Sequence, residues 1–105
     1  MGQERTGKTM KEYQIQIEET GSKGRVFIGD PDKPLAEMTW SRAGEELLII
    51  DHTEVSPSLK GQGIGRKLLD RVVQMARYNS IRILPLCPFA KSVFDKDPLL
   101  RDVLK

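Results

Sequence analysis

The sequence predicts a single α/β domain whose mixed β-sheet combines an antiparallel meander with one strand–helix–strand unit. Three observations lead to this prediction: four β-patterned segments come first, one long amphipathic helix follows them, and a short apolar strand follows the helix. A strand–helix–strand unit makes its two strands parallel, with a right-handed crossover. The length of 105 residues suits one domain and leaves no room for a second.

The first four β-segments are expected to form the antiparallel meander. The first segment alternates polar and apolar residues, which indicates a half-buried strand. The fourth begins with a continuous apolar run, as in a central strand covered on both faces. A five-residue turn at 20–24 joins the first two segments. The segments span residues 12–18, 25–28, 35–41 and 47–55; Tyr13, Ile15 and Ile17 share one side of the first, and Ala36, Met38 and Trp40 share one side of the third.

Helical periodicity begins after the fourth strand. Residues 63–78 carry apolar side chains at intervals of three and four positions, which predicts an amphipathic helix that ends at Asn79. A strand follows at 81–84, and its pairing with the fourth strand should fail at Pro85, which has no N–H to donate. Two short helices then complete the order β-β-β-β-α-β-α-α. They start at Pro88 and Pro98, and the second places Leu99, Leu100, Val103 and Leu104 on one buried side.

Composition limits the function. The chain is 38% hydrophobic and 30% charged with a net charge of +2, an ordinary globular balance that does not indicate nucleic acid. No apolar run approaches the roughly 18 residues that would cross a membrane. Residues 1–11 are polar, so we expect a flexible tail without a secretory signal before a domain at 12–105. With one Cys and one His, an internal disulfide is excluded and a metal site is not expected, so we predict a cytoplasmic location.

The loop at residues 60–65, Lys-Gly-Gln-Gly-Ile-Gly, lies between the fourth strand and the long helix. Its glycines permit positive φ and a close approach to a ligand, and the unpaired N–H groups of a helix start favour an anion such as phosphate. Arg66 and Lys67 are cations in the first helical turn, an unfavourable position that a bound polyanion would reverse. The glycines alone leave open a turn that merely closes the connection. A P-loop or a Rossmann fingerprint is excluded because the required spacings are absent.

This loop resembles the Arg/Gln-x-x-Gly-x-Gly/Ala signature of the GNAT N-acetyltransferases, which cradles the pyrophosphate of acetyl-CoA. Gly63 and Gly65 match the signature, and Lys60 stands where Arg or Gln is usual. Residues 87–94 are similar to the family segment Asn-x-x-Ala-x-x-x-Tyr, with Ala90 matched and Phe94 in place of Tyr. The resemblance is closest to a small stand-alone subfamily with a Cys at the acetyl end, a His-Thr segment and a Gly-x-Gly-Ile-Gly loop.

The resemblance implies a GNAT-like acyl-CoA N-acyltransferase fold that lacks the helices between strands one and two. It also implies acetyl-CoA as cofactor and an unidentified amine as acceptor, bound on an open side, with no nucleic acid or membrane as partner. Strands four and five should splay near Pro85 and hold the cofactor. Because Phe94 cannot protonate a departing thiolate, a non-catalytic acyl-CoA-binding or protein-interaction module is the alternative. The expected cofactor-binding residues are Thr53, Glu54, Val55, Lys60, Gly61, Gln62, Gly63, Ile64, Gly65, Arg66, Lys67 and Ala90.

Two residues are candidates for catalysis. If Pro88 is the first helical residue, Cys87 is the N-cap, where the positive end of the helix favours a thiolate that could accept the acetyl group. We predict an accessible sulfur there, although a lone cysteine can also be a small buried hydrophobe. His52 lies on a central strand and could deprotonate an amine or Cys87, or serve as a hydrogen-bonded structural residue.

Overall fold

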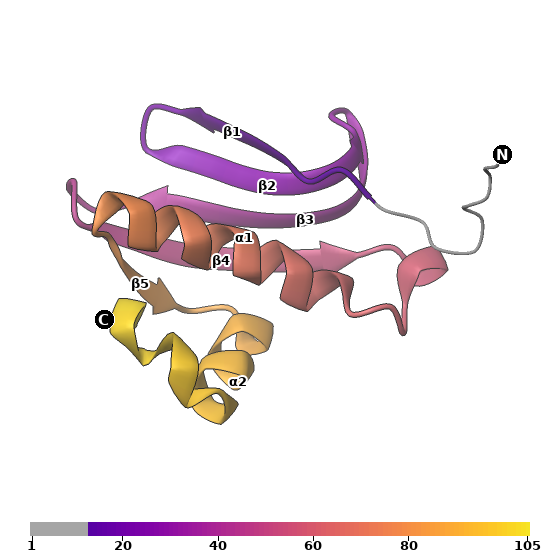
Figure 1. Ribbon diagram of the computed structural model, residues 1–105. Coiled ribbons are helices and arrows are strands. Elements are labelled where there is room, and N and C mark those ends of the chain that lie inside the picture. Colours follow the sequence, from indigo (N-terminus) through magenta and orange to yellow (C-terminus); the bar gives the residue numbers. More distant parts are fainter. Residues whose placement is uncertain (1–12) are drawn as a thin grey trace, which may run out of the picture.

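The computed structural model describes residues 13–105, which form a five-stranded mixed sheet in the order β1-β2-β3-β4-β5 (Figure 1). Strands β1 to β4 are antiparallel, and β5 is parallel to β4, which confirms the predicted fold class. The predicted tail at 1–11 lies outside the described residues. The strands are β1 Gln16–Thr20, β2 Lys23–Asp30, β3 Lys33–Arg42, β4 Leu47–Val55 and β5 Arg82–Pro85.

The turns between the first three strands are tighter than predicted. Thr20 pairs with Lys23, so a two-residue turn replaces the five-residue turn expected at 20–24. Gly21 permits this turn because its φ is +62°. The prediction was wrong since main-chain pairing continues through polar residues at strand ends. The first strand therefore begins later than expected: Tyr13 and Ile15 pack on the core ahead of it, whereas Ile17 is 38% exposed.

Helix α1, Ile64–Asn79, packs along one face of the sheet (Figure 1). It lies one residue later than the predicted helix and ends where Ser80 adopts a left-handed conformation with φ of 57°. The predicted apolar stripe is buried and forms one core cluster with the sheet. That stripe consists of Ile64, Leu68, Leu69, Val72, Val73 and Ala76.

The chain ends in helix α2, Pro88–Lys96, and the 3₁₀ helix η2, Pro98–Val103. A 3₁₀ helix has three residues per turn, so Leu100 and Val103 lie on the same side and both are buried. Leu99 is 78% exposed, so the predicted four-residue apolar side was wrong at this position. Beyond η2, the Lys105 N–H donates to the Ile83 carbonyl at 2.9 Å, which covers the outer edge of β5.

All buried residues of α1, α2 and η2 belong to the cluster that includes Met38, Trp40 and Ile50 of the sheet. The alternate residues of β3, such as Thr39 and Ser41, therefore lie on the other face, which no helix of the described residues covers. We call this face the open face. Among residues 13–105, no helix is both long and apolar enough to cross a membrane.

Leu100→Ala should lower the free energy of unfolding by about 2–5 kcal/mol, because it leaves a cavity beneath η2. Leu99→Ala is the matched control, since Leu99 lies one position away and is exposed; its effect should stay within about 0.5 kcal/mol. Urea unfolding followed by tryptophan fluorescence measures both. Equal effects would contradict a packed η2.

Candidate functional site

The glycine loop leads into α1 through an N-cap that has no side chain. Gly61 and Gly63 have φ of +81° and +69°, and no atom lies within 4 Å of a Cβ built at either position. Gly63 is the N-cap of α1, no side chain caps this end, and the first turn contains no acidic residue. The first N–H groups of α1 therefore face open space, an arrangement suited to an anionic ligand.

Strands β4 and β5 separate beside this loop. Their pairing ends at Ile50 and Pro85, after which the N–H groups of Leu86 and Cys87 both donate to the Ile50 carbonyl. Strand β4 continues to Val55 with β3 alone as its partner. Ser56 donates to the Leu35 carbonyl on the β3 side at 2.7 Å. Because successive residues of a strand direct their backbone groups to opposite edges, Thr53 and Val55 direct theirs toward the edge that β5 has left.

A groove of about 460 Å³ runs from the glycine loop to this free edge of β4. Phe89 and Val93 of α2 form its apolar wall. A Cβ at Gly65 would lie 2.8 Å from the Phe89 ring, so the third glycine of the loop allows α2 to approach α1. The groove is lined by Thr53, Val55, Leu59, Lys60, Gly61, Gly63, Ile64, Gly65, Arg66, Phe89 and Val93.

Eight of the twelve residues predicted to bind the cofactor line the groove, and four do not. Gln62 and Lys67 are exposed, Glu54 is exposed on the neighbouring strand, and Ala90 is buried with its N–H directed at Cys87. Prediction missed Leu59, Phe89 and Val93. The Phe89/Val93 spacing was visible as a helical i,i+4 pair, but that spacing does not distinguish a groove wall from a core contact.

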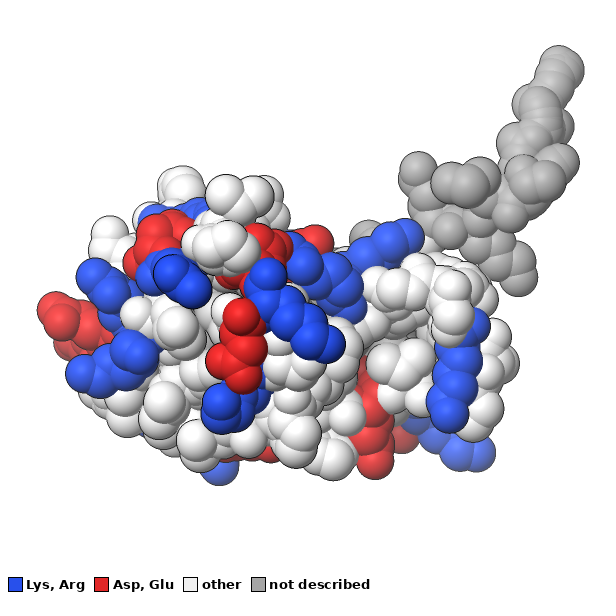
Figure 2. Space-filling view, turned by 90° about the horizontal axis from the view of Figure 1, so that it is seen from below, with Lys and Arg blue, Asp and Glu red and all other residues white. Residues whose placement is uncertain are grey.

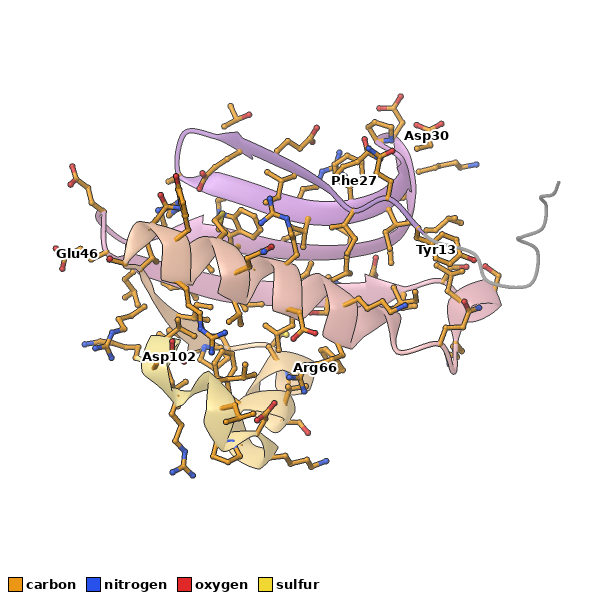
Figure 3. All side chains as sticks on the ribbon, in the orientation of Figure 1. Tyr13, Phe27, Asp30, Glu46, Arg66 and Asp102 are labelled. Atoms are coloured by element: carbon orange, nitrogen blue, oxygen red, sulfur yellow. The ribbon has the colours of Figure 1, made fainter. Side chains whose placement is uncertain are left out.

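Arg66 lies at the groove and bonds to two carboxylates (Figure 3). Its Nε donates to Asp70 at 2.8 Å and its Nη2 donates to Asp97 at 2.7 Å. The first bond lies within α1, and the second ties α1 to η2, for which Asp97 is the N-cap. The hydrogen bond from Arg66, followed by that from the Leu99 backbone N–H, holds the pKa of Asp97 below its usual range. Arg66 is thus a structural tie as well as a groove residue.

Cys87 is the N-cap of α2, as predicted from Pro88. Its sulfur accepts a hydrogen bond from the Ala90 N–H at 3.4 Å and lies 3.2 Å from the Thr53 hydroxyl oxygen. The predicted accessibility was wrong, because Cys87 is only 4% exposed. The residue packs in the core cluster beneath the strand divergence, and Thr53 separates its sulfur from the groove.

His52 lies on the open face of the sheet. It pairs with Thr39, whose neighbours Met38 and Trp40 point into the core. Thr53, the next residue, points to the side of Cys87, so the structure does not bring the imidazole to the thiol. The His52 side chain is 61% exposed, and its Nε2 lies 3.3 Å from a Glu54 carboxylate oxygen.

Phe94 is buried in the core at 2% exposure. It follows Ala90 by one helical turn, and both belong to the cluster that joins α2 to the sheet. Its ring therefore packs the helix against the fold and offers no proton to a ligand in the groove.

A mixed sheet whose two parallel strands separate beside a glycine-rich helix start defines a GNAT-type fold. The family model described as GCN5-related N-acetyltransferase matches residues 25–103. A solution structure of a GCN5-like protein from Staphylococcus aureus, a candidate N-acetyltransferase, is 40% identical. The match covers 86% of this chain and 87% of that chain, with a TM-score of 0.69. The chain therefore belongs to the GCN5-related N-acetyltransferase family.

More distant structures share the fold alone. The ribosomal-protein-S18-alanine N-acetyltransferase of Escherichia coli is 13% identical, with a TM-score of 0.58 over 73% of this chain and 52% of that chain. A GNAT family acetyltransferase from Elizabethkingia anophelis with acetyl-CoA bound is 15% identical, with a TM-score of 0.55 over 71% and 52%. This chain thus spans about half of each. Among curated proteins, none matches significantly.

Asp97→Asn should make the unfolding free energy less dependent on acidic pH. Because the folded-state pKa of Asp97 is lowered, the carboxylate stabilises the fold above its unfolded value of about 3.9, and this stabilisation is lost as pH falls through the folded value. Asparagine retains the capping oxygen, so the variant isolates the charge. Urea unfolding should show the largest difference from the wild type at neutral pH. A difference that persists in strong acid would contradict the pairing.

Proposed function

We propose that this chain is an acetyl-CoA-dependent N-acetyltransferase that binds its cofactor in the groove and transfers the acetyl group to an amine. One observation carries the proposal: the glycine loop, the uncapped start of α1 and the free edge of β4 line the same groove. Membership of the family supports the reaction type. The distant family member with acetyl-CoA bound supports the cofactor.

Each part of the groove suits a different part of acetyl-CoA. The N–H groups at the start of α1 would hold the pyrophosphate, with Lys60 as a neighbouring cation. The backbone of Thr53 and Val55 would pair with the pantetheine amides, as an added strand pairs with a sheet edge. Phe89 and Val93 would cover the apolar stretches. The acetyl thioester would then lie where β4 and β5 separate, near Thr53.

We assign Cys87 the role of acetyl carrier in this proposal. Its sulfur would attack the thioester carbonyl carbon, and CoA would leave as a thiolate when its carbon–sulfur bond breaks. The amine nitrogen would then attack the acetyl-cysteine, form the amide bond and release the Cys87 thiolate. The Ala90 N–H and the Thr53 hydroxyl can both donate to that thiolate. Because the sulfur is buried behind Thr53, this route requires the Thr53 side chain to move.

A non-catalytic acyl-CoA-binding or interaction module is the second candidate. Phe94 favours it, because a buried phenyl ring stands where the family motif has a tyrosine that can protonate the departing thiolate. Such a module would use the same groove and bind acetyl-CoA without turnover. The two candidates therefore differ in transfer and agree in binding.

Gly63→Asp should weaken acetyl-CoA binding at least tenfold, because a carboxylate beside the helix start would repel the pyrophosphate. Gly63→Asn is the matched control, since it has the same shape, tolerates a positive φ and carries no charge. In the wild type, acetyl-CoA at about 100 times its Kd should add roughly 2.7 kcal/mol, on the order of 10 °C in Tm. Thermal melts with and without acetyl-CoA measure this. An undiminished shift in Gly63→Asp would misplace the cofactor.

Cys87→Ala should abolish transfer and leave acetyl-CoA affinity within about twofold, because the sulfur lies outside the groove lining. Mass spectrometry of the wild type after incubation with acetyl-CoA should show one acetyl group on Cys87. Cys87→Ser keeps the N-cap acceptor and serves as the control for folding. If Cys87→Ala transfers at the wild-type rate, the amine attacks acetyl-CoA directly. If the wild type binds acetyl-CoA and transfers nothing to any amine tested, the chain is a binding module.

A further inference from the structure

We propose that Glu54 is a positioning residue for His52, and that the pair removes a proton from the acceptor amine on the open face. The inference rests on the proposed function, because it assigns residues to the acceptor half of that reaction. It also gives the Glu54 side chain a role separate from the cofactor, since that side chain does not line the groove.

Strand alternation places the pair opposite the acetyl end. Thr53 lies between His52 and Glu54 in sequence and points to the groove side, where its hydroxyl contacts Cys87. His52 and Glu54 point to the open face, and their side chains meet at 3.3 Å. Strand β5 stops pairing at Ile50, two residues earlier, so no neighbouring strand covers this part of β4 on that side. An amine on the open face would therefore approach the acetyl group through the gap beside Thr53.

The other charged groups on this face are occupied elsewhere. Glu37 lies opposite Glu54 and pairs with Arg25 of β2 at 2.7 Å. Asp51, which occupies a bulge in β4, accepts a hydrogen bond from the Ser41 hydroxyl at 2.8 Å. Thr39, opposite His52, carries no charge. Within residues 13–105, Glu54 is the charged side chain in contact with the imidazole.

This contact fits a defined chemical role. A carboxylate beside Nε2 favours the neutral tautomer with hydrogen on Nε2, which leaves Nδ1 free to accept a proton. His52 would take one proton from the ammonium form of the acceptor, and Glu54 would stabilise the imidazolium. The amine would lose its second N–H proton as the amide forms, and the departing thiolate would be protonated. The acceptor class is therefore an aliphatic amine, which is cationic in solution.

The test is a double-mutant cycle on acetyl transfer to diaminobutane, an aliphatic dication. His52→Gln should lower kcat about a hundredfold and Glu54→Gln about tenfold, with the Kd of acetyl-CoA unchanged. Glu54→Gln added to His52→Gln should cause no further loss, because Glu54 acts through the imidazole. Glu54→Asp should recover part of the rate. Glu37→Gln is the matched control: it removes the same charge from the opposite position and should keep the wild-type kcat.

Three outcomes would overturn the inference. If the two substitutions multiply, Glu54 acts independently of His52. If Glu54→Gln raises KM for diaminobutane and leaves kcat unchanged, Glu54 binds the acceptor instead. If Glu37→Gln lowers kcat as much as Glu54→Gln, the effect is the general field of the face. A wild type that binds acetyl-CoA without any transfer would refute the proposed enzymatic function itself, which distinguishes that failure from the other three.

Discussion

The separation of β4 and β5 at Pro85 is the constraint on which the site depends. Proline has no N–H, so the parallel ladder cannot continue through it, and the chain leaves β4 after a last pair with Ile50. The next two N–H groups, of Leu86 and Cys87, share the Ile50 carbonyl, and this arrangement sets Cys87 at the start of α2. The free edge of β4, the N-cap cysteine and the position of α2 over the groove all follow from that departure.

The surface as a whole gives no guide to a partner. Figure 2, which views the molecule from the side of α2 and η2, shows acidic and basic side chains interspersed without a single-sign patch. Several of these charges are paired within the fold: Arg77 bonds to Asp102, and Arg66 to Asp97 (Figure 3). Function must therefore be argued from the groove and from the exposed pair on β4, where the chemistry of single residues decides.

The sequence predicted what depends on local pattern. The glycine loop, α1, the start of α2 and the parallel β4–β5 pair all follow from periodicity, proline positions and helix signals. The errors concern contacts between distant segments. Neither the bond from Arg66 to Asp97, 31 residues apart, nor the burial of Cys87 under Thr53 leaves a trace in spacing. Leu99 was misplaced because a four-residue helical period was assumed where the chain forms a three-residue one.

Strand β4 divides the proposed reaction between its two sides. Alternation gives Thr53 to the groove and its neighbours His52 and Glu54 to the open face. A donor bound along the groove and an acceptor on the open face would thus meet across one strand, at the point where β5 no longer blocks the passage. The same alternation separates His52 from Cys87, so a proton cannot pass directly between them. Proton removal from the amine and acetyl transfer would therefore depend on different residues.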